Sequence, residues 1–132
     1  MVRLAALAAL AATPLIAEPV SSHGGKLAHF LTQRAEFAAS GKRVVIDRYC
    51  DSACLVFLSL PNACAMPGTV LGLHAAANKS ALGGLIYANR LPDGMREFWL
   101  RRFLDEPSPR KVYRIKAEDA ARRGWDVRIC VE

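Results

Sequence analysis

Two residues that could perform acyl-transfer chemistry stand directly after predicted strands. Residues 43–47 form a short run rich in β-branched side chains, and Ser52 follows it where a helix is predicted to begin. His74 ends the apolar segment 69–73, a second strand candidate. The carboxyl ends of parallel strands meet at one crevice of an α/β sheet, so we expect the two side chains to converge. A neutral imidazole there would accept the serine proton as the hydroxyl attacks a carbonyl carbon.

A pair of glycines is placed where it could support the same reaction. Gly24 and Gly25 precede residues 26–39, whose apolar side chains recur at helical spacing. Glycine lets the backbone turn sharply and leaves N–H groups uncovered, and such groups can stabilise the negative oxygen of a tetrahedral intermediate. We therefore expect both glycines to contribute to an oxyanion hole. The preceding His23 is expected to be a loop residue.

Each of these residues also has a purely structural interpretation. Ser52 or Asp51 could cap the helix predicted over residues 53–60, which would stabilise that helix by about 1 kcal/mol. His74 could be a half-buried histidine without a chemical role, and the two glycines could form a simple turn. Only the arrangement of these segments in space separates the structural interpretation from the catalytic one.

Helical and β-branched segments alternate along the chain, which is typical of β-α-β units and a small, largely parallel sheet. Residues 75–91 are predicted as an irregular loop, because Asn, Ser and a Gly pair interrupt them. Residues 95–104 have the apolar stripe of an amphipathic helix, residues 116–123 predict a short helix, and residues 126–131 predict a closing strand. We expect a single α/β domain over residues 18–132. Its core is expected to include Phe30, Leu31, Val45, Ile46, Val56, Phe57, Val70 and Leu71.

Four cysteines favour an oxidising compartment, in which an even number would pair. Cys50 and Cys54 are separated by the predicted strand-to-helix turn, so their Cα atoms can lie within the roughly 4.4–6.8 Å that a disulfide needs. Among the three connectivities that four cysteines permit, we favour this pair together with Cys64–Cys130. The competing interpretation is a metal site of Cys50, Cys54 and His74. Its C-x3-C spacing differs from the usual C-x2-C and no second ligand pair follows, so no metal is expected.

The first residues have the pattern of an export signal. A short basic start is followed by an Ala/Leu-rich run, and residues 1–17 are too short and too weakly apolar to span a bilayer. We expect cleavage near Glu18 and a periplasmic or secreted protein, and therefore no membrane span. The alternative is an N-terminal helix or strand of the folded domain.

The formal charge of +6 comes from scattered basic residues. No basic run is interleaved with aromatic side chains, as nucleic-acid sites often are. The charge is more typical of a solvated surface, and we expect no nucleic-acid partner.

Several motifs, in chain order, resemble those of the Clp-protease/crotonase superfamily, in particular its exported periplasmic branch. S-H-G-G at residues 22–25 resembles the family's S-P-G-G, with His23 in place of proline. C-D-S-A-C at residues 50–54 resembles C-x-S-A-C, and L-G-L-H at residues 71–74 resembles an apolar run that ends in G-x-H. K-A-E-D-A-A-R-R-G-W-D at residues 116–126 resembles a late element of the family. The resemblance covers nearly all of the chain after the signal.

This resemblance implies a crotonase/Clp-protease-like fold in which Ser52 is the nucleophile and His74 the base. The backbone of Gly24 and Gly25 would help to form the oxyanion hole. Because little chain remains before Gly24 once a signal is removed, the fold could be truncated at its N-terminus. The position of the family's acid falls near Val112, where no carboxylate stands.

The function implied is that of a serine-hydrolase-like protein, a small peptidase that acts on a peptide or protein by acyl transfer without a cofactor. Asp105 could replace the absent acid if its loop is drawn in toward the site. Homo-oligomers are common in the superfamily, so a homo-oligomer is expected here. The alternative is a non-catalytic binding or assembly domain on the same fold, which would use the crevice or the helix over residues 95–104.

Overall fold

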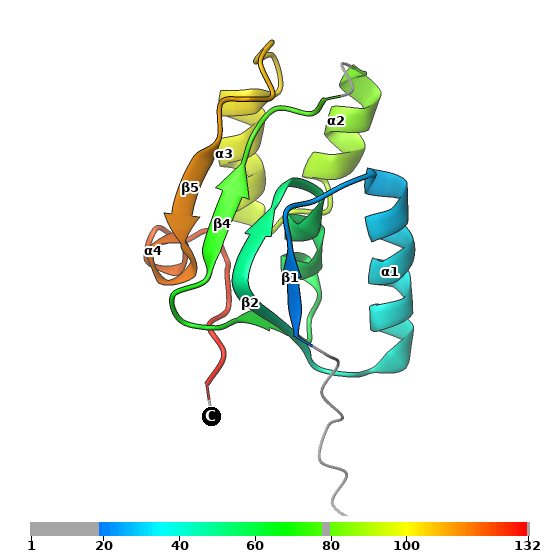
Figure 1. Cartoon of the computed structure of the whole chain (residues 1–132), viewed down its shortest axis with the longest axis vertical. Coiled ribbons are helices and arrows are strands. Elements are labelled where there is room, and N and C mark those ends of the chain that lie inside the picture. The colour runs from blue at the N-terminus through cyan, green and yellow to red at the C-terminus, as the bar shows by residue number, and fades with distance from the viewer. Residues whose placement is uncertain (1–18, 78–79, 132) are drawn as a thin grey trace, which may run out of the picture.

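The computed structural model describes residues 19–77 and 80–131 (Figure 1). Residues 1–17, predicted to be a signal peptide, lie outside these ranges. Within them the chain has the mixed α/β structure that the sequence predicts, with a five-stranded sheet. No helix of the described part is long and apolar enough to cross a membrane.

The sheet is organised around β2 (Val44–Asp51). β1 (Val20–Ser22) runs parallel to one edge of β2, while β3 (Ala63–Ala65) and β4 (Val70–Leu73) run parallel to its first and second halves. β5 (Tyr113–Lys116) pairs antiparallel with β4 and completes the order β1-β2-β4-β5. The predicted parallel sheet is therefore confirmed in part, since only its last strand reverses direction.

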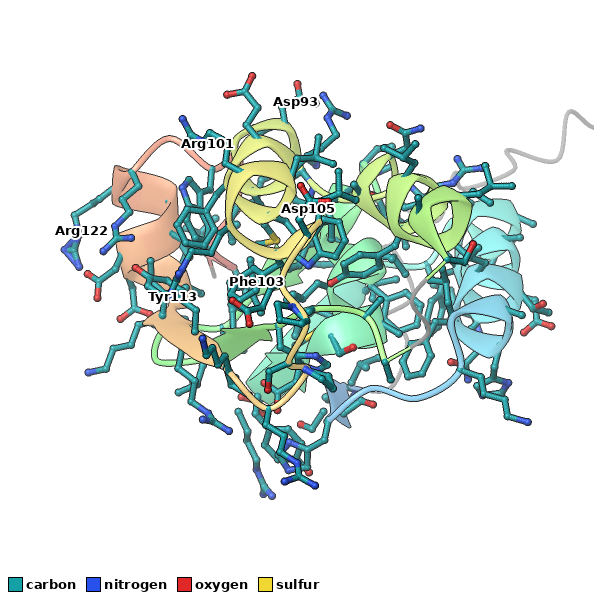
Figure 2. All side chains as sticks on the ribbon, turned by 90° about the horizontal axis from the view of Figure 1, so that it is seen from above. Asp93, Arg101, Phe103, Asp105, Tyr113 and Arg122 are labelled. Atoms are coloured by element: carbon teal, nitrogen blue, oxygen red, sulfur yellow. A yellow bond between two sulfur atoms is a disulfide. The ribbon has the colours of Figure 1, made fainter. Side chains whose placement is uncertain are left out.

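Helices lie on one side of this sheet, as the view from above shows (Figure 2). They are α1 (Leu27–Ser40), α2 (Ala81–Ala88) and α3 (Asp93–Phe103). The 3₁₀ helix η1 (Ser52–Ser59) packs against α1 and β2, and its residues 53–58 are all buried. The core therefore forms between η1, the longer helices and the inner face of the sheet.

Most of the predicted core residues are buried. Those that are buried are Phe30, Val45, Ile46, Val56, Phe57 and Leu71. Leu31 and Val70 are only half-buried. Leu31 packs at the margin of the core cluster, whereas Val70 lies opposite Tyr49 on the face of the sheet turned away from the longer helices. The two errors come from side chains at the boundary of the core.

Two helices end or pack as their sequences predict. α1 stops at Gly41, whose φ of 65° lies in the left-handed region that favours glycine. The apolar stripe predicted over residues 95–104 becomes the inner face of α3, with Met95, Trp99 and Phe103 all buried.

The loop predicted over residues 75–91 is wrong, because this segment contains α2. The Ser80 side chain caps that helix by accepting a hydrogen bond of 3.2 Å from the N–H of Gly83. A Cβ at Gly84 would lie 3.3 Å from the ring of Trp99, so the missing side chain lets α2 pack closely on α3. Here Gly84 marks close helix packing rather than an irregular loop.

Other local predictions also need correction. The expected N-terminal truncation is wrong in part, because β1 is present and pairs with β2. The sequence predicts no strand where β5 lies, and the closing strand predicted over residues 126–131 is reduced to one bridge between Ala65 and Ile129. The late helix is α4 (Ala117–Arg122). Strands this short have too few residues for a recognisable period of two.

Two disulfide bonds have the pairing favoured from the sequence. Cys50 and Cys54 join the end of β2 to η1, with their Cα atoms 5.4 Å apart. Cys64 and Cys130 join β3 to the C-terminal segment, with a Cα separation of 4.9 Å. The N–H of Cys130 also donates to the carbonyl of Ala65 at 2.9 Å, so this bond fastens the last residues of the chain to the sheet.

The two disulfides should contribute unequally to stability. Replacing Cys64 and Cys130 with Ala should lower the free energy of unfolding by about 4 kcal/mol, against about 2 kcal/mol for Cys50 and Cys54. The reason is that the bonds close loops with sequence separations of 66 and 4 residues, respectively. Urea unfolding of the two double variants and the oxidised wild type measures this order. A larger loss for the short loop would contradict it.

Candidate functional site

The ends of β2 and β4 bring the two predicted catalytic residues to the same edge of the sheet. Asp51, the last residue of β2, lies directly opposite Gly72 of β4. Ser52 follows Asp51, and His74 follows the end of β4 one residue after Leu73. Parallel pairing in this register therefore makes the chain leave both strands in the same direction, as expected from the sequence.

Ser52 has an unusual backbone conformation. Its φ is 57°, in the left-handed region, which costs a residue with a Cβ about 1–3 kcal/mol. The predicted capping role is wrong, because neither Ser52 nor Asp51 makes a side-chain cap to η1. The Ser52 hydroxyl therefore makes no capping bond to η1, and strained backbone of this kind is often found at functional sites.

Three neighbouring contacts hold this turn. The Cys50–Cys54 disulfide closes it from both sides. A Cβ on Gly24 would lie 2.9 Å from the Cβ of Ser52, so only glycine allows the preceding loop to approach. The Tyr87 hydroxyl donates to the backbone carbonyl of Ser52 at 2.8 Å. Burial raises the pKa of the Tyr87 phenol, so that this group remains a hydrogen-bond donor at any physiological pH.

The orientation of the His74 ring is set by the backbone. Nδ1 of His74 lies 2.7 Å from the carbonyl oxygen of Ala75. A carbonyl can only accept, so Nδ1 carries the proton and the neutral ring keeps its lone pair on Nε2. The indole of Trp99 donates to the His74 carbonyl at 3.0 Å and fixes the main chain at this position. His74 therefore has the tautomer that a general base needs.

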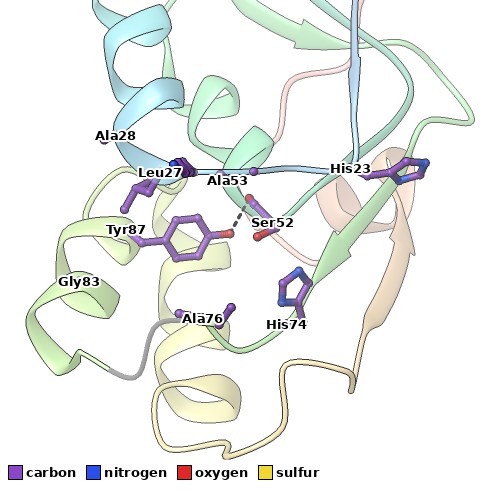
Figure 3. A pocket seen from close by; sticks show the side chains of 12 residues that line it. His23, Leu27, Ala28, Ser52, Ala53, His74, Ala76, Gly83 and Tyr87 are labelled. Carbon is purple, nitrogen blue, oxygen red and sulfur yellow. Dashed lines mark hydrogen bonds between the residues drawn. The ribbon is translucent and has the colours of Figure 1, made fainter.

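Ser52 and His74 line the same pocket, which has a volume of about 710 Å³. Figure 3 shows their side chains on adjoining walls of it, with Tyr87 facing them. Among the described residues, no hydrogen bond joins the serine hydroxyl to the imidazole. The rest of the lining is mostly small or apolar, but it also includes His23 and Lys26. Its small or apolar residues include Leu27, Ala28, Ala53, Ala76, Ala77 and Gly83. Such a pocket could hold an apolar side chain next to the hydroxyl.

The loop between β1 and α1 passes beside Ser52, but the two predicted oxyanion donors differ. The N–H of Gly24 donates to Oγ of Ser22 at 3.1 Å. Gly25 lines the pocket, and no acceptor for its N–H is found within the described part of the chain. The N–H of Ala53 lies in the first turn of η1, where helices have no internal acceptor. Gly25 and Ala53 are thus better placed to donate than Gly24.

Within residues 19–77 and 80–131, no carboxylate is hydrogen-bonded to His74. Val112 and Asp105 are both exposed, and neither lines the pocket. The carboxylate nearest to Ser52 in the chain is that of Asp51, which is buried. It accepts a hydrogen bond from Nδ1 of His23 at 2.7 Å. The sequence does not reveal this pair, although Asp51 directly precedes the serine.

The comparisons with known proteins bear on the fold. No protein-family model matches the chain. No curated protein matches it. Among solved structures, a ClpP1 mutant from Listeria monocytogenes is similar, with a TM-score of 0.51 and 13% identity over 86% of this chain and 72% of that one. At this identity the likeness concerns the fold alone, and the chain has a Clp-protease-like fold.

Proposed function

We propose that this chain is an exported serine-hydrolase-like protein that cleaves peptides by acyl transfer, without a cofactor. Ser52 is the nucleophile and His74 the general base. One observation carries the proposal: a serine in a strained turn shares a pocket with a histidine whose Nε2 has no hydrogen-bond partner in the described part of the chain. The parallel register of β2 and β4, which brings both residues to one edge, supports it.

Four residues of the pocket take part in the proposed reaction. The hydroxyl oxygen of Ser52 bonds to the carbonyl carbon of the substrate as its proton passes to Nε2 of His74. The N–H groups of Gly25 and Ala53 stabilise the negative oxygen that forms. The carbon–nitrogen bond then breaks, and His74 gives the proton to the departing amine. Water releases the acyl group from Ser52 by the same steps.

The Ala75 carbonyl takes over part of the role of a triad acid. In an Asp-dependent triad, loss of the acid lowers kcat by about 10⁴, largely because the imidazole adopts the wrong tautomer. Here the carbonyl fixes the correct tautomer, but it has no full negative charge to stabilise the imidazolium. Turnover should therefore be slow, while a reactive acylating or phosphonylating reagent should still modify Ser52.

An alternative is a non-catalytic binding domain, and one observation favours it. α2 exposes Leu82, Leu85 and Ile86, of which Leu82 is 67% exposed. These side chains form an apolar stripe on the helix that carries pocket residues Gly83 and Tyr87. The predicted use of the helix over residues 95–104 fits less well, because the apolar face of α3 is buried in the core. In this alternative, α2 would hold a partner or a second copy of the chain.

Labelling with a fluorophosphonate separates the two functions. In the wild type, the hydroxyl of Ser52 should displace fluoride from the probe and form a covalent adduct. Ser52→Ala, Ser52→Asn and His74→Ala should each abolish labelling, with little further loss in a double variant because the two residues act as a unit. Mass spectrometry of the oxidised protein locates the adduct. Labelling that persists in the Ser52 variants excludes Ser52, and a folded, unlabelled wild type favours the binding domain.

The strain at Ser52 gives a second prediction. Ser52→Gly should have a free energy of unfolding about 1 kcal/mol higher than that of Ser52→Ala, and therefore a higher melting temperature. The reason is that glycine adopts a φ of 57° without a Cβ clash. Neither variant has a hydroxyl, so both should lose labelling. Thermal melts of the two variants, run beside the labelling assay, test this. A more stable alanine variant would mean that the turn relaxes in solution.

Export gives a third prediction. Expressed with its own N-terminus, the protein should be recovered outside the cytoplasm with an N-terminus near Glu18, because residues 1–17 are removed as a signal. N-terminal sequencing or intact mass measures this. Ala17→Trp is a matched control that should block cleavage, since signal peptidases require a small residue there. A soluble cytoplasmic product that begins at Met1 would contradict the prediction.

A further inference from the structure

We infer that His23 is a positioning residue, which holds the glycine loop of residues 23–25 against the nucleophile turn by its contacts with Tyr49 and Asp51. The inference rests on the proposed function, because the loop supplies the Gly25 N–H to the oxyanion. We call His23, Tyr49 and Asp51 the latch. None of its members belongs to the Ser52–His74 pair, and His23 stands where the resembled family has proline.

The latch combines two contacts on one exposed imidazole. The His23 ring stacks on the Tyr49 ring, with centroids 4.0 Å apart and an angle of 10° between the planes. Its Nδ1 donates to Oδ2 of Asp51 at 2.7 Å. The His23 side chain is 73% exposed, whereas that of Asp51 is 11% exposed. A surface side chain in two directional contacts with the same strand, β2, is held in one orientation.

The sheet leaves room for the Asp51 carboxylate. Gly72 lies opposite Asp51 on β4, and a Cβ at Gly72 would be 2.2 Å from Oδ1 of Asp51. No larger residue fits there without moving the carboxylate. Asp51 is therefore an anchor of fixed position, placed one residue before Ser52.

The latch restricts the position of the Gly25 N–H through the backbone of residues 23–25. Of residues 23–25, only His23 has a side chain, so it is the only residue of the loop that can be anchored in this way. The next residue, Gly24, has a φ of 97° and lies directly against the carbonyl of Asp51 and the Cβ of Ser52. Gly25 follows with its N–H uncommitted. A loop with two glycines has high backbone entropy, and a fixed neighbour restricts it.

The hydrogen bond of the latch does not require a charged histidine. Neutral imidazole can carry its proton on Nδ1 and donate to a carboxylate, as the imidazolium also does. An asparagine side chain can place an amide N–H at about the position of Nδ1. His23→Asn should therefore keep the bond to Asp51, whereas His23→Ala removes both contacts.

The test compares His23→Ala, His23→Asn and the control His29→Ala in the oxidised, processed protein. His29 is exposed on α1 and does not line the pocket of Ser52. Loss of one oxyanion donor lowers rates by about 10²–10³, so His23→Ala should slow fluorophosphonate labelling by about 10-fold or more, with Asn recovering most of the rate. Backbone order parameters of Gly24 and Gly25, from ¹⁵N relaxation, should fall from about 0.85 to below about 0.6 in His23→Ala only.

The two readouts separate this inference from the proposed function. Unchanged order parameters in His23→Ala overturn the latch, whether or not the wild type is labelled. Increased loop motion with an unchanged labelling rate overturns its effect on the oxyanion donor. A wild type that is not labelled overturns the proposed function, while the relaxation data still decide whether His23 holds the loop. Slower labelling and a mobile loop in His23→Ala, both restored in His23→Asn, support the inference.

Discussion

The chain must turn sharply where β2 ends and the buried helix η1 begins. The Cys50–Cys54 disulfide bond spans this turn. Ser52 lies in the middle of that turn with a left-handed backbone. The conformation is unfavourable for a residue with a Cβ, so it persists only because the surroundings over-determine it. The disulfide, the close approach of Gly24 and the hydrogen bond from Tyr87 supply that surrounding structure.

The elements around the turn come from distant parts of the sequence. β2 and β4 set the common edge, α2 brings the Tyr87 hydroxyl, and α3 brings the Trp99 indole to the His74 carbonyl. Each contact ends on a backbone carbonyl. The framework thus fixes main-chain positions and leaves the serine hydroxyl and the imidazole Nε2 without partners among the described residues. This division between rigid backbone and free reactive atoms is what a preorganised site requires.

The sequence could locate the candidate pair because its signals are local: a β-branched run before Ser52, and an apolar run before His74. The cysteine pairing was accessible for the same reason, since Cys50 and Cys54 flank one short turn. The α2 helix could not be predicted in this way, because the role of Gly84 depends on Trp99, which lies on another helix. The His23–Asp51 contact spans 28 positions and depends on the parallel register of β1 and β2. The Ala75 carbonyl is a backbone atom, which no residue type reveals.

The Cys50–Cys54 bond also determines where in the cell the proposed nucleophile can exist in its strained form. In a reducing cytoplasm the two cysteines would remain reduced, and one of the contacts that hold Ser52 in its left-handed conformation would be missing. The left-handed turn, unfavourable by about 1–3 kcal/mol, would then depend on the approach of Gly24 and the hydrogen bond from Tyr87, and it would relax more readily toward an ordinary conformation. Under the proposed export, oxidation outside the cytoplasm would complete the strained turn, so the proposed hydrolase would be least reactive inside the cell that makes it.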